Sequence, residues 1–140
     1  MSKGLKIKIT VILSVLVMFL SLLGIDALIA STYKIETEDL SALTIVADGE
    51  QIVSVKIRLT KRGKAVEGHE IFAMAYGGGG FIRPRLVTNE EGIAVFQYRT
   101  YRSTRFTPAG EVRFEFKDYS NSVFIRVSAA GEQTIVLIEP

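Results

Sequence analysis

The sequence predicts an all-β antiparallel sandwich of about seven to eight strands, preceded by one N-terminal transmembrane helix. Three observations predict this class. Residues 9–25 contain no charged side chain. From residue 42 onward, apolar and polar residues alternate with a period of two, which is typical of half-buried strands. Turn-forming residues separate the alternating stretches, and no convincing helical pattern follows the apolar run.

The apolar segment covers residues 9–30, a length of 22 residues. A helix that rises about 1.5 Å per residue needs roughly 20 such residues to cross a bilayer core of about 30 Å. We therefore expect a tail over residues 1–8, a transmembrane helix over 9–30 that contacts the lipid bilayer, a short polar stalk over 31–41 and a sandwich domain over 42–140.

The charges that flank the apolar segment predict its orientation. Lys3, Lys6 and Lys8 precede it, whereas Glu36 and Glu38 are among the residues that follow it. Because positive charge is retained on the cytoplasmic side, the N-terminus is expected in the cytoplasm and the sandwich outside it. The expected location is the cell membrane, with a single pass.

Two interpretations share this orientation, namely a permanent signal anchor and a cleaved signal peptide. Cleavage after Ala27 or Ala30 would place Ile25 or Leu28 at the third-last position, where signal peptidases need a small residue. The apolar run also exceeds the usual length of about 7–15 residues for the core of a signal peptide. Both points favour the anchor.

Composition excludes several classes of function. The first thirty residues hold three lysines and one aspartate, which leaves 14 basic and 14 acidic residues for the rest of the chain. The net charge of +2 is therefore a topology signal, and no nucleic-acid partner is expected. The absence of cysteine excludes disulfide scaffolds, zinc fingers and thiol catalysis.

Strict alternation marks three strands, at residues 52–60, 111–118 and 122–130. Weaker patterns predict strands at 42–47, 69–76, 85–88, 93–100 and 133–138, with a turn at Gly131 and Glu132 between the last two strands. The residues expected to face the space between two sheets are Val55, Ile57, Phe96, Phe114, Phe116, Ile125 and Val127.

Three stretches together carry a family resemblance. They are RGKAVEGHEIF at residues 62–72, VTNEEGIAVF at 87–96 and AGEVRFEF at 109–116. Their order and spacing resemble the group 1 bacterial Ig-like domains of invasin and intimin, over about residues 42–130. The resemblance implies an Ig-like β-sandwich and a binding function. These motifs consist of turn chemistry and core alternation, so they specify fold far better than function.

No motif indicates catalysis or a cofactor. The glycines at 77–80 lead into FIRPR and a strand rather than a helix, so they form neither a phosphate loop nor a dinucleotide loop, and a flexible loop or bulge is expected. His69 stands beside Glu67 and Glu70, but adjacent strand residues point to opposite faces, so no metal site is expected. We expect no enzyme activity, no cofactor and no bound metal.

An arginine-rich and aromatic cluster is the candidate partner-binding surface. Alternating the strand directions places the loops at 77–84 and 101–110 at the same end of the domain, distal to the membrane. Arginine and tyrosine are enriched among the energetically dominant residues of interfaces. The candidate residues are Phe81, Arg83, Arg85, Tyr101, Arg102 and Arg105.

The function that these observations predict is a non-catalytic, membrane-anchored domain that serves as an accessory or structural subunit of a membrane or envelope assembly. Other membrane or envelope proteins are the expected partners. Ser14, Ser21, Gly24 and Asp26 are the candidates for packing against another membrane subunit. The alternative is a secreted, adhesin-like module that binds carbohydrate or a surface after cleavage of the signal peptide.

Overall fold

The computed structural model describes residues 2–120 and 128–140. In this part of the chain one helix, α1 (Lys3–Ser31), precedes ten strands. The strands are β1 (Tyr33–Thr37), β2 (Ile45–Val46), β3 (Ile52–Lys61), β4 (Lys64–Ala65), β5 (Glu70–Tyr76), β6 (Gly80–Phe81), β7 (Arg85–Val87), β8 (Ile93–Arg99), β9 (Glu111–Asp118) and β10 (Ala129–Ile138).

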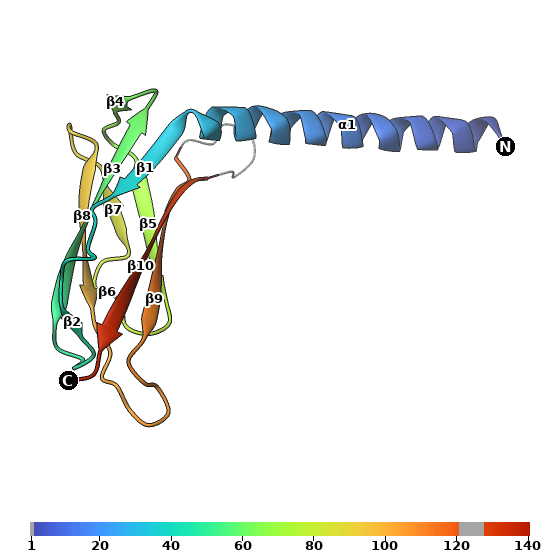
Figure 1. The fold of residues 1–140 in the computed structure, drawn as a ribbon. Helices are drawn as coiled ribbons and strands as arrows, with labels where there is room; N and C mark the ends of the chain where they lie inside the picture. The colour runs from blue at the N-terminus through green and yellow to red at the C-terminus, as the bar shows by residue number, and fades with distance from the viewer. Residues whose placement is uncertain (1, 121–127) are drawn as a thin grey trace.

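Helix α1 is long and apolar enough to cross a membrane. Ser2 caps its first turn, because the Ser2 hydroxyl accepts a hydrogen bond from the Leu5 amide at 3.3 Å. The helix therefore begins well before Ile9, and residues 3–8 of the expected tail are helical. At the other end the Thr32 hydroxyl donates to the Ile29 carbonyl, where the helix gives way to β1. Figure 1 shows α1 projecting from one end of the strands.

Two sheets form the sandwich that the alternation predicts. One has the order β1-β3-β8-β6, with β4 paired to β3, and the other has the order β2-β10-β9-β5-β7. All pairs are antiparallel except β2 with β10, which is parallel. β1 is an edge strand of the first sheet and β2 is an edge strand of the second. The chain therefore crosses from one sheet to the other between these two strands.

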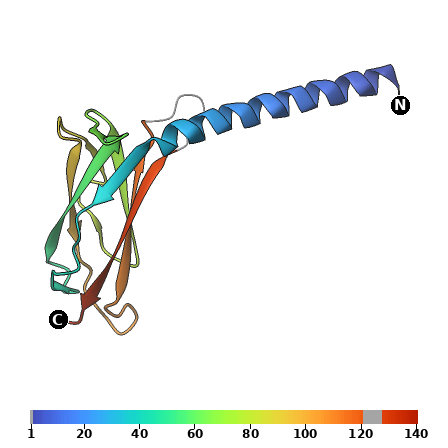
Figure 2. The ribbon, with the colours of Figure 1, turned by 45° about the horizontal axis from the view of Figure 1, so that its top comes forward.

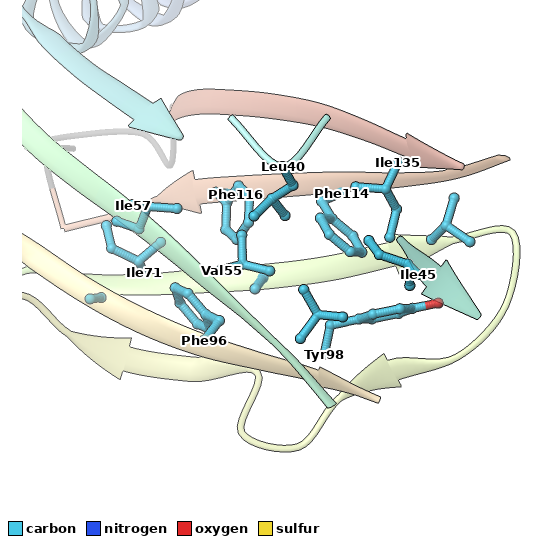
Figure 3. Close-up of a cluster of buried hydrophobic side chains, with 14 of the residues drawn as sticks. Leu40, Ile45, Val55, Ile57, Ile71, Phe96, Tyr98, Phe114, Phe116 and Ile135 are labelled. Atoms are coloured by element: carbon cyan, nitrogen blue, oxygen red, sulfur yellow. The ribbon is translucent and has the colours of Figure 1, made fainter. Parts of the chain in front are cut away.

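The core lies between the two sheets (Figure 3). Each strand sends alternate residues inward, and the aromatic rings of β8 and β9 meet at the centre, with Tyr98 and Phe114 centroids 4.8 Å apart. This confirms five predicted core residues, all fully buried: Val55, Ile57, Phe96, Phe114 and Phe116. The predicted core residues Ile125 and Val127 lie outside the described residues.

The segment expected as a stalk over residues 31–41 contains a strand. β1 pairs along its whole length with β3, from Tyr33 opposite Lys61 to Thr37 opposite Ile57. Ile35 is buried in the core cluster. The prediction of a stalk is therefore wrong, and the sandwich begins at Tyr33 rather than at residue 42. The sequence pattern misses the strand because this polar segment forms an edge strand in which Ile35 is the one buried apolar residue.

The last strand also differs from the expectation. Residues 122–127 of the predicted strand at 122–130 lie outside the described residues. The predicted turn at Gly131 and Glu132 is wrong, because both residues lie inside β10, where Gly131 pairs with Phe116. A Cβ on Gly131 would lie 2.8 Å from Ile35 Cγ2, so this glycine permits the close approach of β1 and does not mark a turn.

Candidate functional site

The loops at 77–84 and 101–110 lie at the end of the sandwich opposite α1 (Figures 1 and 2). Gly80 pairs with Arg99 across β6 and β8, which ties the first loop to the strand that leads into the second. A Cβ on Gly78 would lie 2.6 Å from the Tyr101 ring, so the loops touch. The structure therefore brings the two loops together, as the strand directions predict.

Phe81, a candidate partner-binding residue, packs inside the sandwich. Its ring centroid lies 5.0 Å from that of Phe114 and 5.7 Å from that of Phe96, and its side chain is only partly exposed. The sequence places Phe81 in a glycine loop, but β6 turns its ring onto the aromatic core. Phe81 is therefore a core residue in this structure.

Three of the four glycines, Gly77, Gly78 and Gly79, pack closely against neighbouring residues in the segment where the sequence predicts a flexible loop or a bulge. Gly79 has a φ of +68°, and a Cβ there would lie 2.5 Å from both the Arg99 carbonyl oxygen and the Tyr98 hydroxyl oxygen. The Tyr98 hydroxyl donates a hydrogen bond to the Gly78 carbonyl at 2.9 Å. Glycine is needed at position 79 because the backbone there passes directly over Tyr98 and Arg99, which leaves no room for a side chain.

Tyr98 should make the fold sensitive to alkali. Burial raises the pKa of its hydroxyl from 10.0 to about 12. The folded-state pKa lies above the unfolded value, so this contribution is fully present below about pH 10 and is lost as the pH rises towards about 12, at up to about 1.4 kcal/mol per pH unit. Denaturant unfolding at about pH 9 and about pH 11 measures the loss.

Tyr98→Phe provides the comparison for this prediction. The variant loses the hydrogen bond to Gly78, at a cost of about 1 kcal/mol near neutral pH, but it has no hydroxyl to ionise. Its stability should therefore fall less between the two pH values than that of the native chain. An equal fall in both chains would show that Tyr98 ionises freely in the folded state.

Arg85 lies apart from the second loop. Arg85 begins β7, where it pairs with Phe72 of β5, and its guanidinium lies 5.4 Å from the Phe72 ring centroid. This places Arg85 on the outer face of the second sheet, away from the loop end of β5 at Tyr76. Arg83 is exposed between β6 and β7.

The loop 101–110 holds the other three candidates in different settings. Tyr101 is half-buried and donates its hydroxyl to the Pro108 carbonyl at 2.9 Å, so it braces the loop from within. The backbone of Arg102 forms an isolated antiparallel β-bridge with Asp48. The Arg102 guanidinium lies 3.7 Å from the carboxylate of Glu50. Arg105 is exposed at the far tip.

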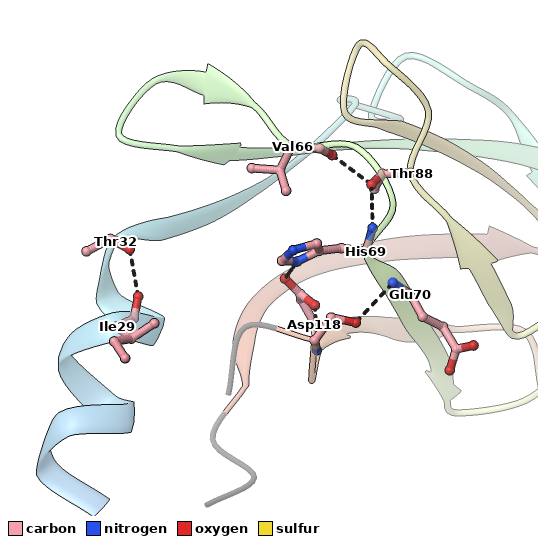
Figure 4. Close-up of polar contacts among 8 residues, drawn as sticks. Ile29, Thr32, Val66, His69, Glu70, Thr88 and Asp118 are labelled. Atoms are coloured by element: carbon pink, nitrogen blue, oxygen red, sulfur yellow. Dashed lines mark hydrogen bonds and ion pairs between the residues drawn. The ribbon is translucent and has the colours of Figure 1, made fainter. Parts of the chain in front are cut away.

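His69 forms a structural pair that the sequence analysis did not anticipate. Its Nδ1 lies 2.7 Å from the carboxylate of Asp118, which is fully buried, although the two residues are 49 positions apart (Figure 4). The neighbouring hydroxyl of Thr88 accepts from the His69 amide and donates to the Val66 carbonyl. Among the described residues no group of three or more His, Cys, Asp or Glu could hold a metal ion.

The His69–Asp118 pair lies at the junction between α1 and the sandwich. The Tyr33 ring, two residues past the helix, lies 5.4 Å from the His69 ring and 5.1 Å below the Lys61 ammonium. The Arg62 amide donates to the Thr32 carbonyl at 3.0 Å. These contacts leave no free linker between the helix and the domain.

Three of the four candidate membrane-packing residues share one face of α1. At about 100° per residue, Ser14, Ser21 and Gly24 lie on the same side of the helix, and all three are exposed. Asp26 points to the opposite side of the helix and is fully buried in the single chain. Ala30 is also buried. The protein itself covers Asp26, which is therefore not free to pack against a second membrane subunit.

Comparison with known proteins identifies similar structures but no similar sequences. No protein-family profile matches the sequence, and no curated protein matches it. The D00-D0 domain of intimin matches 75% of this chain and 46% of its own length, at 14% identity and a TM-score of 0.54. The D0-D1 domain of intimin matches equal shares at 15% identity, with a TM-score of 0.52.

A third similar structure is a C-terminal 282-residue fragment of intimin in complex with the intimin-binding domain of the translocated intimin receptor. It matches 74% of this chain and 32% of its own length, at 17% identity and a TM-score of 0.52. This chain thus spans less than half the length of the solved chains that it matches. At these identities the likeness defines the fold: behind its apolar helix, the chain has the bacterial Ig-like sandwich fold of the intimin domains.

Proposed function

We propose that this protein is a single-pass membrane protein whose Ig-like sandwich binds other proteins, as a non-catalytic accessory or structural subunit of a membrane or envelope assembly. The observation that carries this proposal is the direct connection between α1 and the sandwich. A helix of membrane-spanning length runs directly into β1, and the Arg62 amide bonds to the Thr32 carbonyl at its end. A domain joined in this way stays close to the bilayer that holds its helix.

The orientation follows from the lysines at the start of α1. Lys3, Lys6 and Lys8 occupy its first turns, whereas its last turn contains no basic residue. The positive-inside rule places the N-terminus in the cytoplasm and the sandwich outside it. In this arrangement the exposed apolar side chains of α1 contact lipid.

The structure also favours an anchor over a cleaved signal peptide. Ala27 and Ala30 lie inside α1, and Ala30 is buried. Cleavage at either residue would remove helical turns that pack against the sandwich, which supports retention of the helix.

The similar intimin structures and the exposed arginines of the loop 101–110 support a protein-binding role. One of the similar intimin structures is a fragment in complex with a receptor domain, so this sandwich fold occurs in a protein that binds another protein. In this chain Arg102 and Arg105 are exposed. They belong to the loop 101–110, which lies at the end of the sandwich opposite α1, where a partner in the same compartment can reach it. Arginine forks form directed hydrogen bonds to carboxylates, which gives such contacts specificity.

Mass spectrometry of the chain recovered from native membranes tests the anchor. We expect a mass of 15.4 kDa, resistance to extraction by alkaline carbonate, and digestion of the sandwich by protease added outside sealed cells. A mature chain that lacks the first 27 or 30 residues and is found in the medium would instead support the secreted, adhesin-like alternative.

A further inference from the structure

The loop 101–110, which we call the finger, ends in a closed two-residue tip. The Thr104 and Thr107 backbones exchange two hydrogen bonds, at 2.9 and 3.2 Å. The Thr104 hydroxyl also accepts from the amides of Phe106 and Thr107. This bonding leaves Arg105 and Phe106 as the two residues at the tip.

The base of the finger is fixed to the sandwich by three contacts. The Glu139 carboxylate, past the end of β10, accepts a hydrogen bond from the Ala109 amide at 3.0 Å and another from the Ser103 hydroxyl. The Ser103 amide donates to the Ala47 carbonyl at 2.9 Å. These bonds order the finger before a partner binds, which lowers the entropic cost of binding.

Phe106 is 92% exposed. Among the large apolar residues described in the sandwich, the next most exposed is Val87, at 60%. The phenylalanine side chain is exposed to water, so its apolar surface contributes no free energy of burial in the free protein. A partner that buried this ring would gain that free energy. Nothing in the hydrogen bonding of the tip requires an aromatic side chain, because only the Phe106 amide takes part.

The charges around Phe106 indicate the chemistry of that partner. The finger contains Arg102 and Arg105 and no acidic residue. Arg102 already lies near Glu50, so Arg105 is the guanidinium beside Phe106 that can pair with a carboxylate. The complementary surface is an apolar socket with an acidic side chain at its rim.

We propose that Phe106 inserts into an apolar socket on a partner protein and that Arg105 pairs with a carboxylate at the rim of that socket. A lipid surface is the less favoured occupant, because the finger lies at the end of the sandwich opposite the point where α1 joins it (Figures 1 and 2). This inference rests on the proposed function, since it names the site through which the partner binds.

The test places a photoreactive benzoylphenylalanine at position 106 of the full chain in its native membranes. We expect one adduct, whose mass equals this chain plus the protein that co-purifies with the native chain. Arg105→Glu in the same chain should abolish the adduct. The matched control carries the photoreactive residue at Val136, which is 59% exposed on β10, and should give no such adduct.

Competition with purified, detergent-solubilised full chain measures the contribution of Phe106. The Phe106→Ala chain should need at least about a 30-fold higher concentration than the native chain to suppress the adduct, whereas Val136→Ala should compete like the native chain. Equal melting temperatures for the three competitors confirm that folding is unchanged.

Each other outcome overturns the proposal. An adduct with lipid assigns the finger to a membrane, and an adduct with the mass of two copies of this chain assigns it to self-association. If the native chain co-purifies with a partner but position 106 forms no adduct with it, the finger is not the interface, although the proposed function stands. If no partner co-purifies with the native chain, the proposed function fails as well.

Discussion

Replacing Phe114 with alanine is expected to lower the free energy of unfolding by about 3–5 kcal/mol. Phe114 is fully buried at the centre of the aromatic core, with ring centroids 4.8 Å from Tyr98 and 5.0 Å from Phe81. The truncation removes the contacts of an entire ring and leaves a cavity that the two sheets cannot close. Such a loss is a large share of the stability of a small domain.

Chemical denaturation of the full chain in detergent measures this loss, and Phe106→Ala is its control. The same side-chain change at the exposed finger tip should move the denaturation midpoint very little, because Phe106 buries almost no surface. Equal effects of the two substitutions would contradict the assignment of Phe114 to the core and of Phe106 to the surface.

Replacing Gly79 with alanine is expected to cost about 2–4 kcal/mol, from overpacking together with a left-handed backbone. The new Cβ would lie 2.5 Å from the Arg99 carbonyl oxygen, which belongs to a strand and cannot move freely. The φ of +68° adds strain for any residue that has a Cβ.

Gly80→Ala is the adjacent control. Nothing lies within 4 Å of a Cβ at Gly80, and its φ is not in the left-handed region. We expect a change of less than about 1 kcal/mol there. If both substitutions are tolerated equally, the packing of Gly79 against Tyr98 and Arg99 does not matter for stability.

The sequence predicts the central strands of this fold well because each of them has one buried face. In β3 and β9 every second residue is apolar, and both strands run where alternation places them. Prediction fails where a strand has few inward residues. β1 buries only Ile35, and the two-residue strands β4 and β6 lie in segments where no strand is expected.

The local geometry of the candidate site depends on contacts between residues far apart in the sequence. Glu139 holds Ser103 across 36 positions, and His69 holds Asp118 across 49. Phe81 follows four glycines, so its burial depends on where β6 docks and not on any local pattern. For the same reason, the sequence places Phe106 in a polar loop between Arg105 and Thr107 but does not indicate its exposure, which the structure shows.

The central claim is that the sandwich binds a different protein while α1 holds it in a membrane. Native mass spectrometry of the full chain, extracted from its own membranes in mild detergent, tests this claim most directly. We predict a complex that contains this 15.4 kDa chain and at least one different protein. A mass that corresponds to the single chain, or to copies of this chain alone, would contradict it.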